Sequence, residues 1–420
     1  MVPLGSAPLS RRRLLRAAAG LAGASAATPT AASEPELSVM TRNLYLGVDL
    51  FRLFGAEDRE ELRAVAGELL AGVRAHPYAA RADAIAAEVA RTTPDVVCLQ
   101  EAALVRTRAP SRFDGDHDPG ATDVLVDLLD LLSAQLAARG LGYTVASALV
   151  TNDVEMPAET DEGPVDLRLT DRVAVLVRDE AAVTATRGGR FAAGVPVPLE
   201  TVELTIRRGF AGVDLTVGGR PVVVASTHLE SLADGVRAAQ AGALADRLPD
   251  DRPVVVGGDL NSGPDHSPGA YERLRESFED AHSARRPDAA GHTCCHDTDL
   301  RNATPSLSRR VDALLYRGTG PPTAVTQVGA DAGARVRVEV DGDSVRVWPS
   351  DHAGVVASLP VPATATGTPT ATATPTTTPT APATPDDTPE SQPGMGLVAT
   401  AVAGAIALLS TLRRRTGGDR

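Results

Sequence analysis

The feature that most constrains the fold is an alternation of short Val-rich runs with longer segments of helical periodicity between residues 37 and 359. Apolar spacing predicts helices at 58–75, 81–91, 122–139 and 233–247. The Val-rich runs predict strands at 37–44, 95–100, 143–149, 172–178, 202–206, 213–217, 221–227, 253–257, 311–316, 335–340, 344–348 and 354–359. Because some strands are separated by helices and others by short turns such as Gly218-Gly219, we predict an α/β fold with mixed sheets.

The core of this domain must be built from Val, Leu and Ala, because hydrophobic residues make up 43% of the chain and aromatic residues only 3%. Residues 34–360 are long enough for one large domain with a single sizeable core. Two acidic segments that contain Pro and Gly, 106–121 and 151–164, are predicted to be long surface loops.

The amino end has the pattern of an export signal. Arg11, Arg12 and Arg13 precede an apolar, Ala-rich run at 17–27, and no acidic residue occurs before Glu34. This order of charge, apolar run and small residues is typical of a twin-arginine signal peptide. We therefore expect residues 1–33 to be removed on export.

The carboxyl end is predicted to hold the protein at the cell surface. Residues 361–391 are mostly Thr, Pro and Ala, a composition that forms an extended stalk rather than a core. Residues 392–420 contain an apolar run at 397–412 followed by Arg413, Arg414 and Arg415. This tail resembles the PGF-type sorting tails of haloarchaeal surface proteins, with Met395 where those tails have Phe. The resemblance implies attachment to the membrane through the tail or a lipid, with export and sorting machinery as partners.

The charge of the central domain fits the same setting. Residues 1–33, 361–391 and 392–420 carry formal charges of +4, −3 and +3, so the −13 of the whole chain corresponds to about −17 on residues 34–360. The chain contains no Lys. A strongly acidic protein with Arg as its only long basic residue resembles a halophile's, in which surface carboxylates maintain solubility. The charge therefore does not identify the substrate.

Three cysteines are too few for a disulfide scaffold in an exported domain of this length. Cys98 lies in an apolar run and is interpreted as a core residue. Cys294 and Cys295 are flanked by His292 and His296, but zinc ligands are usually separated by at least two residues. The sequence therefore does not favour a zinc site at this pair.

Polar residues recur at the ends of the apolar strands, where α/β folds bind ligands. They are Asn43, Glu101, His228, Asp259, Asn261, Asp312, Asp351 and His352. Each alone has an ordinary explanation as a turn former, a helix-terminal charge or a core histidine. Together they combine carboxylates, which bind hard cations such as Mg²⁺, with imidazole and amide groups that bind a phosphoryl group.

The segments that carry these residues resemble the successive motifs of the endonuclease/exonuclease/phosphatase superfamily, the group that includes DNase I. The segments are 94–101, 226–229, 258–262, 310–312 and 350–352. The resemblance implies a four-layer α-β-β-α sandwich and a Mg²⁺-dependent phosphoric ester hydrolase, with Mn²⁺ as an alternative ion.

The resemblance also implies the role of each residue. Glu101 would be the main metal ligand, with Asn43 and Asp351 near the same ion. Asp259 and Asn261 would orient or activate the attacking water and hold the phosphate. His228 and His352 would contact the scissile phosphate, one as general base and the other as acid or electrostatic stabiliser. Asp312 would orient a histidine. Arg168, Asp171 and Arg172 are further candidates for contact with the phosphate.

Three functions remain open. The first is a secreted, surface-anchored phosphodiesterase or nuclease, expected to be a monomer, with extracellular DNA as one candidate substrate. The second is a phosphomonoesterase acting on lipid- or sugar-phosphate headgroups, and the third is a non-catalytic surface module that retains the fold. The intact set of polar residues disfavours the third function, whereas the sequence does not separate the first two.

Overall fold

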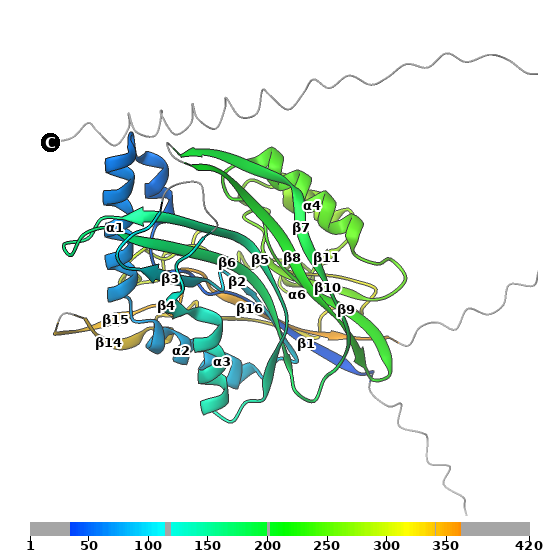
Figure 1. Cartoon of the computed structure of the whole chain (residues 1–420). Helices are drawn as coiled ribbons and strands as arrows, with labels where there is room; N and C mark the ends of the chain where they lie inside the picture. Colours follow the sequence, from blue (N-terminus) through cyan, green and yellow to red (C-terminus); the bar gives the residue numbers. More distant parts are fainter. Residues whose placement is uncertain (1–33, 114–118, 200–201, 341, 363–420) are drawn as a thin grey trace, which may run out of the picture. The chain divides into compact units, whose positions relative to one another are not determined.

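The computed structural model describes residues 34–113, 119–199, 202–340 and 342–362 (Figure 1). The predicted signal peptide, the C-terminal tail and all but the first two residues of the predicted stalk lie outside these ranges. Among the helices in these ranges, none has the length and hydropathy needed to cross a bilayer.

The first sheet contains eight strands, and β1 and β2 at its centre are parallel whereas the other pairs are antiparallel. Its order is β13 (Ala324–Val328), β16 (Gly354–Pro360), β1 (Glu36–Asn43), β2 (Val96–Gln100), β6 (Val165–Arg178), β3 (Leu104–Arg108) and β4 (Asp123–Asp127), with β5 (Tyr143–Ala158) also paired to β6.

The second sheet contains six strands, and β9 and β10 are its parallel pair. Its order is β11 (Glu279–Asp280), β12 (Asp312–Arg317), β10 (Val254–Asp259), β9 (Arg220–His228), β8 (Val202–Val217) and β7 (Ala182–Leu199). A separate hairpin is formed by β14 (Val336–Val340) and β15 (Asp343–Val347).

The two sheets pack face to face. The helices are α1 (Arg59–Ala75), α2 (Tyr78–Thr92), α3 (Leu128–Ala138), α4 (Asp234–Arg247), α5 (Gly269–Arg275) and α6 (Ala281–Arg285), with short 3₁₀ turns η1 (Leu50–Gly55) and η2 (Ala332–Ala334). The helices other than α6 cover the outer faces of the sheets, while Ala281 of α6 packs into the core between the sheets.

Side chains alternate between the two faces of each strand, and this alternation shows how the layers form. In β2, Val96 and Cys98 pack against the second sheet, whereas Val97 and Leu99 pack with α2 and α3. Apolar residues of α4 and α5 pack in the same way on the outer face of the second sheet. The expected four-layer α-β-β-α sandwich is thereby confirmed.

Three local predictions were wrong. Residues 123–127 are strand rather than helix, and the Asp127 carboxylate caps α3 by accepting the backbone N–H groups of Leu129 and Asp130. Much of the predicted loop 151–164 extends β5. The predicted strands 202–206 and 213–217 are one strand, β8, paired with the unpredicted β7. Gly209, between the two predicted strands, permits close packing, since a Cβ on it would lie 2.5 Å from Leu149 Cδ2.

Candidate active site

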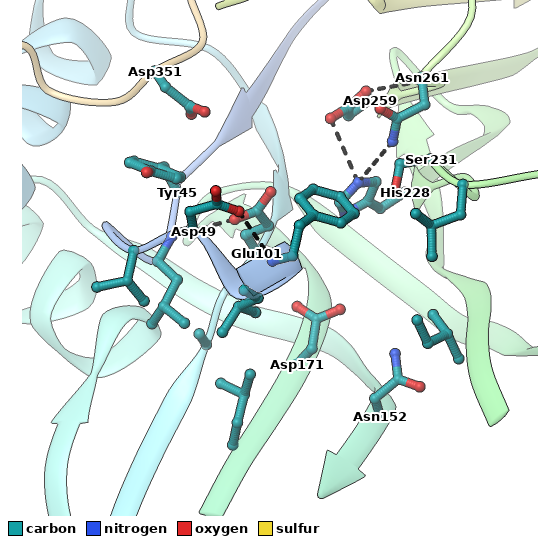
Figure 2. A pocket seen from close by; sticks show the side chains of 18 of the residues that line it. Tyr45, Asp49, Glu101, Asn152, Asp171, His228, Ser231, Asp259, Asn261 and Asp351 are labelled. Carbon is teal, nitrogen blue, oxygen red and sulfur yellow. Dashed lines mark hydrogen bonds and ion pairs between the residues drawn. The ribbon is translucent and has the colours of Figure 1, made fainter. Parts of the chain in front are cut away.

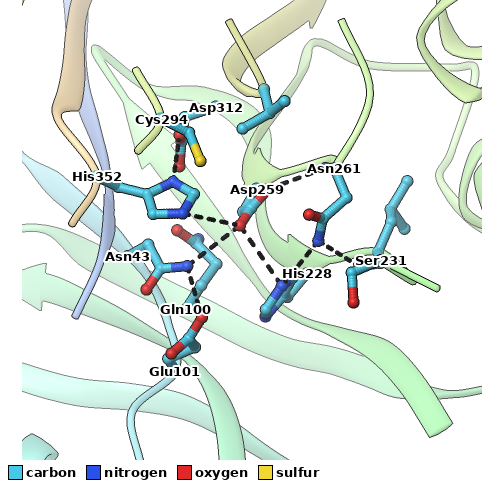
Figure 3. A network of polar contacts seen from close by, with 12 residues as sticks. Asn43, Gln100, Glu101, His228, Ser231, Asp259, Asn261, Cys294, Asp312 and His352 are labelled. Carbon is cyan, nitrogen blue, oxygen red and sulfur yellow. Dashed lines mark hydrogen bonds and ion pairs between the residues drawn. The ribbon is translucent and has the colours of Figure 1, made fainter. Parts of the chain in front are cut away.

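Three of the predicted site residues are neighbours in the register of the second sheet. Asp259, the last residue of β10, lies opposite His228 at the end of β9 and opposite Asp312 at the start of β12. In the first sheet Asn43 ends β1, and Glu101 directly follows its parallel neighbour β2. The strand ends of both sheets therefore bring these side chains into one polar network (Figure 3).

Glu101 has a left-handed backbone conformation, with φ of 50°, which is strained for a residue other than glycine. Its carboxylate accepts hydrogen bonds from Asn43 Nδ2 at 3.0 Å and from the backbone N–H of Leu46 at 3.2 Å. Burial raises the pKa of Glu101, which the Asn43 hydrogen bond offsets in part and the Asp171 carboxylate reinforces. A strained carboxylate beside a cavity marks a functional position.

Asp259 lies at the centre of the network. Its Oδ1 accepts the backbone N–H of Asn261 at 2.9 Å, and its Oδ2 accepts Asn43 Nδ2 at 3.1 Å. The same Oδ2 is 3.5 Å from His228 Nε2 and 3.8 Å from His352 Nε2. Burial raises the pKa of Asp259 to about 6 despite the nearby His352.

His352 is oriented by Asp312. The distance from His352 Nδ1 to Asp312 Oδ2 is 2.8 Å, and the Asp312 side chain is fully buried. The carboxylate therefore accepts a hydrogen bond from the Nδ1–H group. Burial alone lowers the pKa of His352, but the carboxylates of Asp312, Asp351 and Asp259 outweigh it and raise the pKa well above its usual value. These carboxylates therefore favour the imidazolium form of His352.

His228 is the opposite case. Burial, together with Arg208 and His352, lowers its pKa well below the usual value, so the ring is neutral. Arg208 Nη1 lies 3.0 Å from Nδ1 and can only donate, which makes Nδ1 the acceptor and places the single ring proton on Nε2. Asn261 Nδ2 is 3.1 Å from Nε2 but also donates to the carbonyl of Leu229 at 3.0 Å.

Asp351 precedes β16 and is half-buried, with its Oδ1 4.0 Å from His352 Nε2. Burial raises its pKa to about 6; His352 lowers the pKa and Glu101 raises it further. Figure 2 shows that the carboxylates of Glu101, Asp171, Asp259 and Asp351 come from separate elements and surround one cavity.

This cavity has a volume of about 620 Å³. Of the predicted site residues, Glu101, His228, Asp259, Asn261, Asp351 and His352 line it. Asn43 and Asp312 are buried in contact with the lining residues, through the hydrogen bonds to Asp259 and His352. The structure thus brings together all eight predicted residues, whereas their individual roles remain predictions.

The cysteine pair lies closer to this site than the sequence suggested. Cys294 and Cys295 are disulfide-bonded to each other and line the cavity, and Cys295 Sγ is 3.9 Å from His352 Nε2. Arg309 donates to both sulfurs. Donor atoms of the two cysteines and His352 lie within 4.8 Å of one another, as do those of Asp259, Asp312 and His352.

Two arginines beside the site were not singled out in the sequence analysis. Arg208 on β8 faces His228, and nothing in its local sequence marks it. Arg81 in α2 is buried and donates hydrogen bonds to the carbonyls of Pro349 and Leu44. It thereby connects two chain segments that lie beside the site. The burial of Arg81 could have been predicted from the sequence, because Arg81 lies on the same apolar helix face as Ile85 and Val89.

The phosphate contacts suggested for the middle of the chain are placed differently. Arg168 is paired with Asp153, and Arg172 is paired with Asp127. Neither is among the described residues that line the cavity, whereas Asp171 is.

A two-sheet sandwich with carboxylates, amides and imidazoles gathered at one edge defines a hydrolase-like α/β protein. Residues 65–352 match the model of the Endonuclease/Exonuclease/phosphatase family, and the chain belongs to that family, whose members hydrolyse phosphoester bonds. No curated protein matches the sequence significantly.

Solved structures of the same family align with most of the chain at low identity. Truncated TDP2 from Caenorhabditis elegans is 20% identical, with 77% of this chain and 97% of that chain covered and a TM-score of 0.45. The mannosyl-6-phosphatase of Bacteroides thetaiotaomicron is 16% identical, with 77% and 99% covered and a TM-score of 0.46. A family protein from Leptotrichia buccalis is 12% identical, with 77% and 99% covered and a TM-score of 0.48. At these values the likenesses do not bear on substrate.

Proposed function

We propose that this protein is a divalent-metal-dependent phosphodiesterase that is exported and anchored at the cell surface. The observation that carries the proposal is the convergence of Glu101, Asp259 and Asp351 with a neutral and a charged imidazole on one cavity. A non-catalytic module would not need several mutually repelling, buried carboxylates, which destabilise a fold that lacks a compensating cation.

The donor set fits a hard divalent cation. Glu101 and Asp351 offer carboxylate oxygens. Glu101 raises the pKa of Asp351, and the carboxylates of Asp171 and Asp259 raise the pKa of Glu101. A bound Mg²⁺ or Mn²⁺ would neutralise charge on the phosphoryl oxygens and stabilise the leaving group. Asn43 at present directs its amide nitrogen at Glu101, while its Oδ1 accepts the backbone N–H of Tyr45 at 2.9 Å. A ligand role for Asn43 would require the amide to turn.

Asp259 is proposed as the general base. The Asn261 backbone N–H fixes Oδ1, so that Oδ2 faces both imidazoles and the cavity. A pKa of about 6 leaves this carboxylate ionised at neutral pH and basic enough to accept a proton from water.

The two histidines are proposed to act differently on the phosphoryl group. His352, held as an imidazolium by Asp312, would stabilise the developing negative charge and supply a proton to the leaving oxygen. Neutral His228, with its proton on Nε2, would donate a hydrogen bond to a phosphoryl oxygen. Arg208 maintains that tautomer.

The proposed location at the cell surface rests on the two ends of the sequence. Extracellular DNA is a first candidate substrate, and the protein is proposed to be a monomer. The phosphomonoesterase alternative differs only in substrate. Bis-nitrophenyl phosphate, mono-nitrophenyl phosphate, plasmid DNA and RNA, assayed with Mg²⁺ in high salt, would distinguish the two functions.

The test of the site uses two variants with opposite behaviour. Glu101→Gln keeps the side-chain shape but removes a charge that would hold the cation, so raising Mg²⁺ or adding Mn²⁺ should restore part of the lost activity. Asp259→Asn should lose about 10²- to 10⁴-fold in kcat without such rescue. Glu276→Gln, at an exposed site in a surface pair with Arg273, is the control and should behave as wild type. Hydrolysis that is unaffected by EDTA would contradict the proposal.

A further inference from the structure

The walls of the cavity change from polar to apolar with distance from the catalytic residues. On β6, alternate residues share a face, and Asp171 near Glu101 is followed along that face by Leu169 and Leu167. On β8 the corresponding row runs from Arg208, which contacts His228, to Ile206 and Leu204.

A third row continues the same gradient on β5. The register pairs Asn152 with Asp171, Val154 with Leu169 and Met156 with Leu167. Asn152 also links β5 to β8 through two hydrogen bonds with the backbone of Arg207, at 2.9 and 3.0 Å. On each of these three strands a polar residue that lines the cavity is therefore followed by two apolar residues that also line it, over about 13 Å of strand.

The 3₁₀ turn η1 completes these walls. None of its six residues is buried, although four of them are Leu or Phe, and Phe51 is 53% exposed. Leu53 and Phe54 line the same cavity. Exposed aromatic residues are costly in a chain with only six Phe, which indicates that this turn contacts an apolar ligand rather than water alone.

The charges of the residues that line the cavity disfavour a polyanionic strand in its apolar part, the part lined by the apolar residues of β5, β6, β8 and η1. The cavity's only arginines among the described lining residues are Arg208, beside His228, and Arg309, beside the cysteines, while its carboxylates are more numerous. A nucleic acid would place successive phosphates along apolar walls that offer no cations to bind them.

From these observations, and resting on the proposed function, we infer that the substrate is a lipid phosphoester: one phosphoryl group carrying one long hydrocarbon substituent. The phosphoryl group would lie between His228 and His352, with the hydrocarbon between β5, β6 and β8 under η1. Water supplies the oxygen that bonds to phosphorus, the P–O bond to the leaving alcohol breaks, and the alcohol leaves with a proton. This inference replaces DNA as the expected substrate.

The test is a homologous series of nitrophenyl alkyl phosphodiesters, from ethyl to decyl, each kept below its micellar concentration and assayed with Mg²⁺ in high salt. If the alkyl chain enters the apolar part, kcat/KM should rise about two- to fourfold per methylene until the cavity is filled. Bis-nitrophenyl phosphate serves as the tail-free reference for catalysis.

Two variants change the apolar walls in opposite ways. Leu169→Asn should lower the ratio of decyl to ethyl kcat/KM at least tenfold, and Ile206→Trp should move the end of the rise to shorter chains because it fills the cavity. Val124→Asn is the control, since Val124 is 63% exposed and lies outside the cavity lining, and it should retain the wild-type slope.

The outcomes separate the two proposals. A flat series with measurable hydrolysis of bis-nitrophenyl phosphate overturns the lipid inference and leaves the proposed function standing, as does a preference for DNA over every alkyl ester. Absence of hydrolysis with every substrate overturns both. Each variant is scored by its own decyl-to-ethyl ratio, so a general loss of activity does not produce the expected result. If one variant fails to fold, the wild-type series and the other variant still provide the test.

Discussion

At the residue scale, the contact between Asp312 and His352 gives the sharpest prediction. Asp312→Asn should lower kcat by about 10²- to 10⁴-fold with little change in KM, because an amide does not hold the Nδ1 proton or stabilise the imidazolium. The sign of the pH effect follows from the pKa of His352, which the carboxylates raise. A group needed in its protonated form loses function as pH rises through its pKa, so the variant's alkaline limb should move to lower pH.

Steady-state kinetics between about pH 5 and 10 measures both effects. Asp250→Asn is the control, since Asp250 is 94% exposed and pairs only at the surface with Arg317. A loss smaller than about threefold, or an unmoved alkaline limb, would show that Asp312 does not position His352.

The cysteine pair gives a second residue-scale prediction. Replacing Cys294 and Cys295 by Ser should leave metal-dependent activity within a few-fold, because adjacent residues are poorly placed to share one zinc ion. Cys98→Ser, at a thiol away from the cavity lining, is the control for metal content. Stoichiometric zinc in the wild type, lost together with activity in the double variant, would instead make the pair part of the site.

At the element scale, α6 depends on Asp280. Its carboxylate caps the helix by accepting the His282 backbone N–H at 2.8 Å, accepts the Tyr271 hydroxyl at 2.7 Å and pairs with buried Arg310. Burial raises the pKa of Asp280, but Arg310 and then Tyr271 outweigh it, and the net pKa is lowered. The folded-state pKa thus lies below the unfolded one. The stabilisation is therefore present above the unfolded-state value of about 3.9 and is lost as pH falls through the folded-state pKa.

Asp280→Asn should lower the free energy of unfolding at pH 7 by about 3 kcal/mol, since it leaves the Arg310 charge buried without its partner. Urea denaturation at pH 7 and at about pH 3 measures the effect, and the difference from wild type should shrink at the lower pH. Asp251→Asn, in an exposed pair with Arg252, should leave the urea midpoint unchanged. Equal destabilisation at both pH values would count against an ionic cause.

At the scale of the whole molecule, export and anchoring stay predictions from the sequence. The mature protein should lack the residues up to a cleavage point between Ala27 and Ser33, and the segment after the stalk should be cut or inserted in a membrane. Mass spectrometry of the native protein measures both. An intact Arg11-Arg12 segment on a cytoplasmic protein would refute the proposed location.

The sequence by itself determined the α/β class, the strand-end position of the polar residues and the membership of Asn43, Glu101, Asp259 and His352 in one candidate site. These features were predictable because strand periodicity and the order of motifs are local properties of the chain. Strand β8 was predicted as two strands, because the polar and glycine-containing segment between 206 and 213 lacks the Val-rich pattern, whereas Gly209 there permits close packing between strands.

Only the tertiary structure decided which side chains surround that site. Arg208 acts on His228 through a contact between neighbouring strands, and Asp171 faces the cavity while Arg172, the next residue, pairs with Asp127. The apolar walls exist only where alternate residues of β5, β6 and β8 face one another across the two sheets. Register and sheet packing join residues distant in sequence, so no local pattern could reveal that cavity.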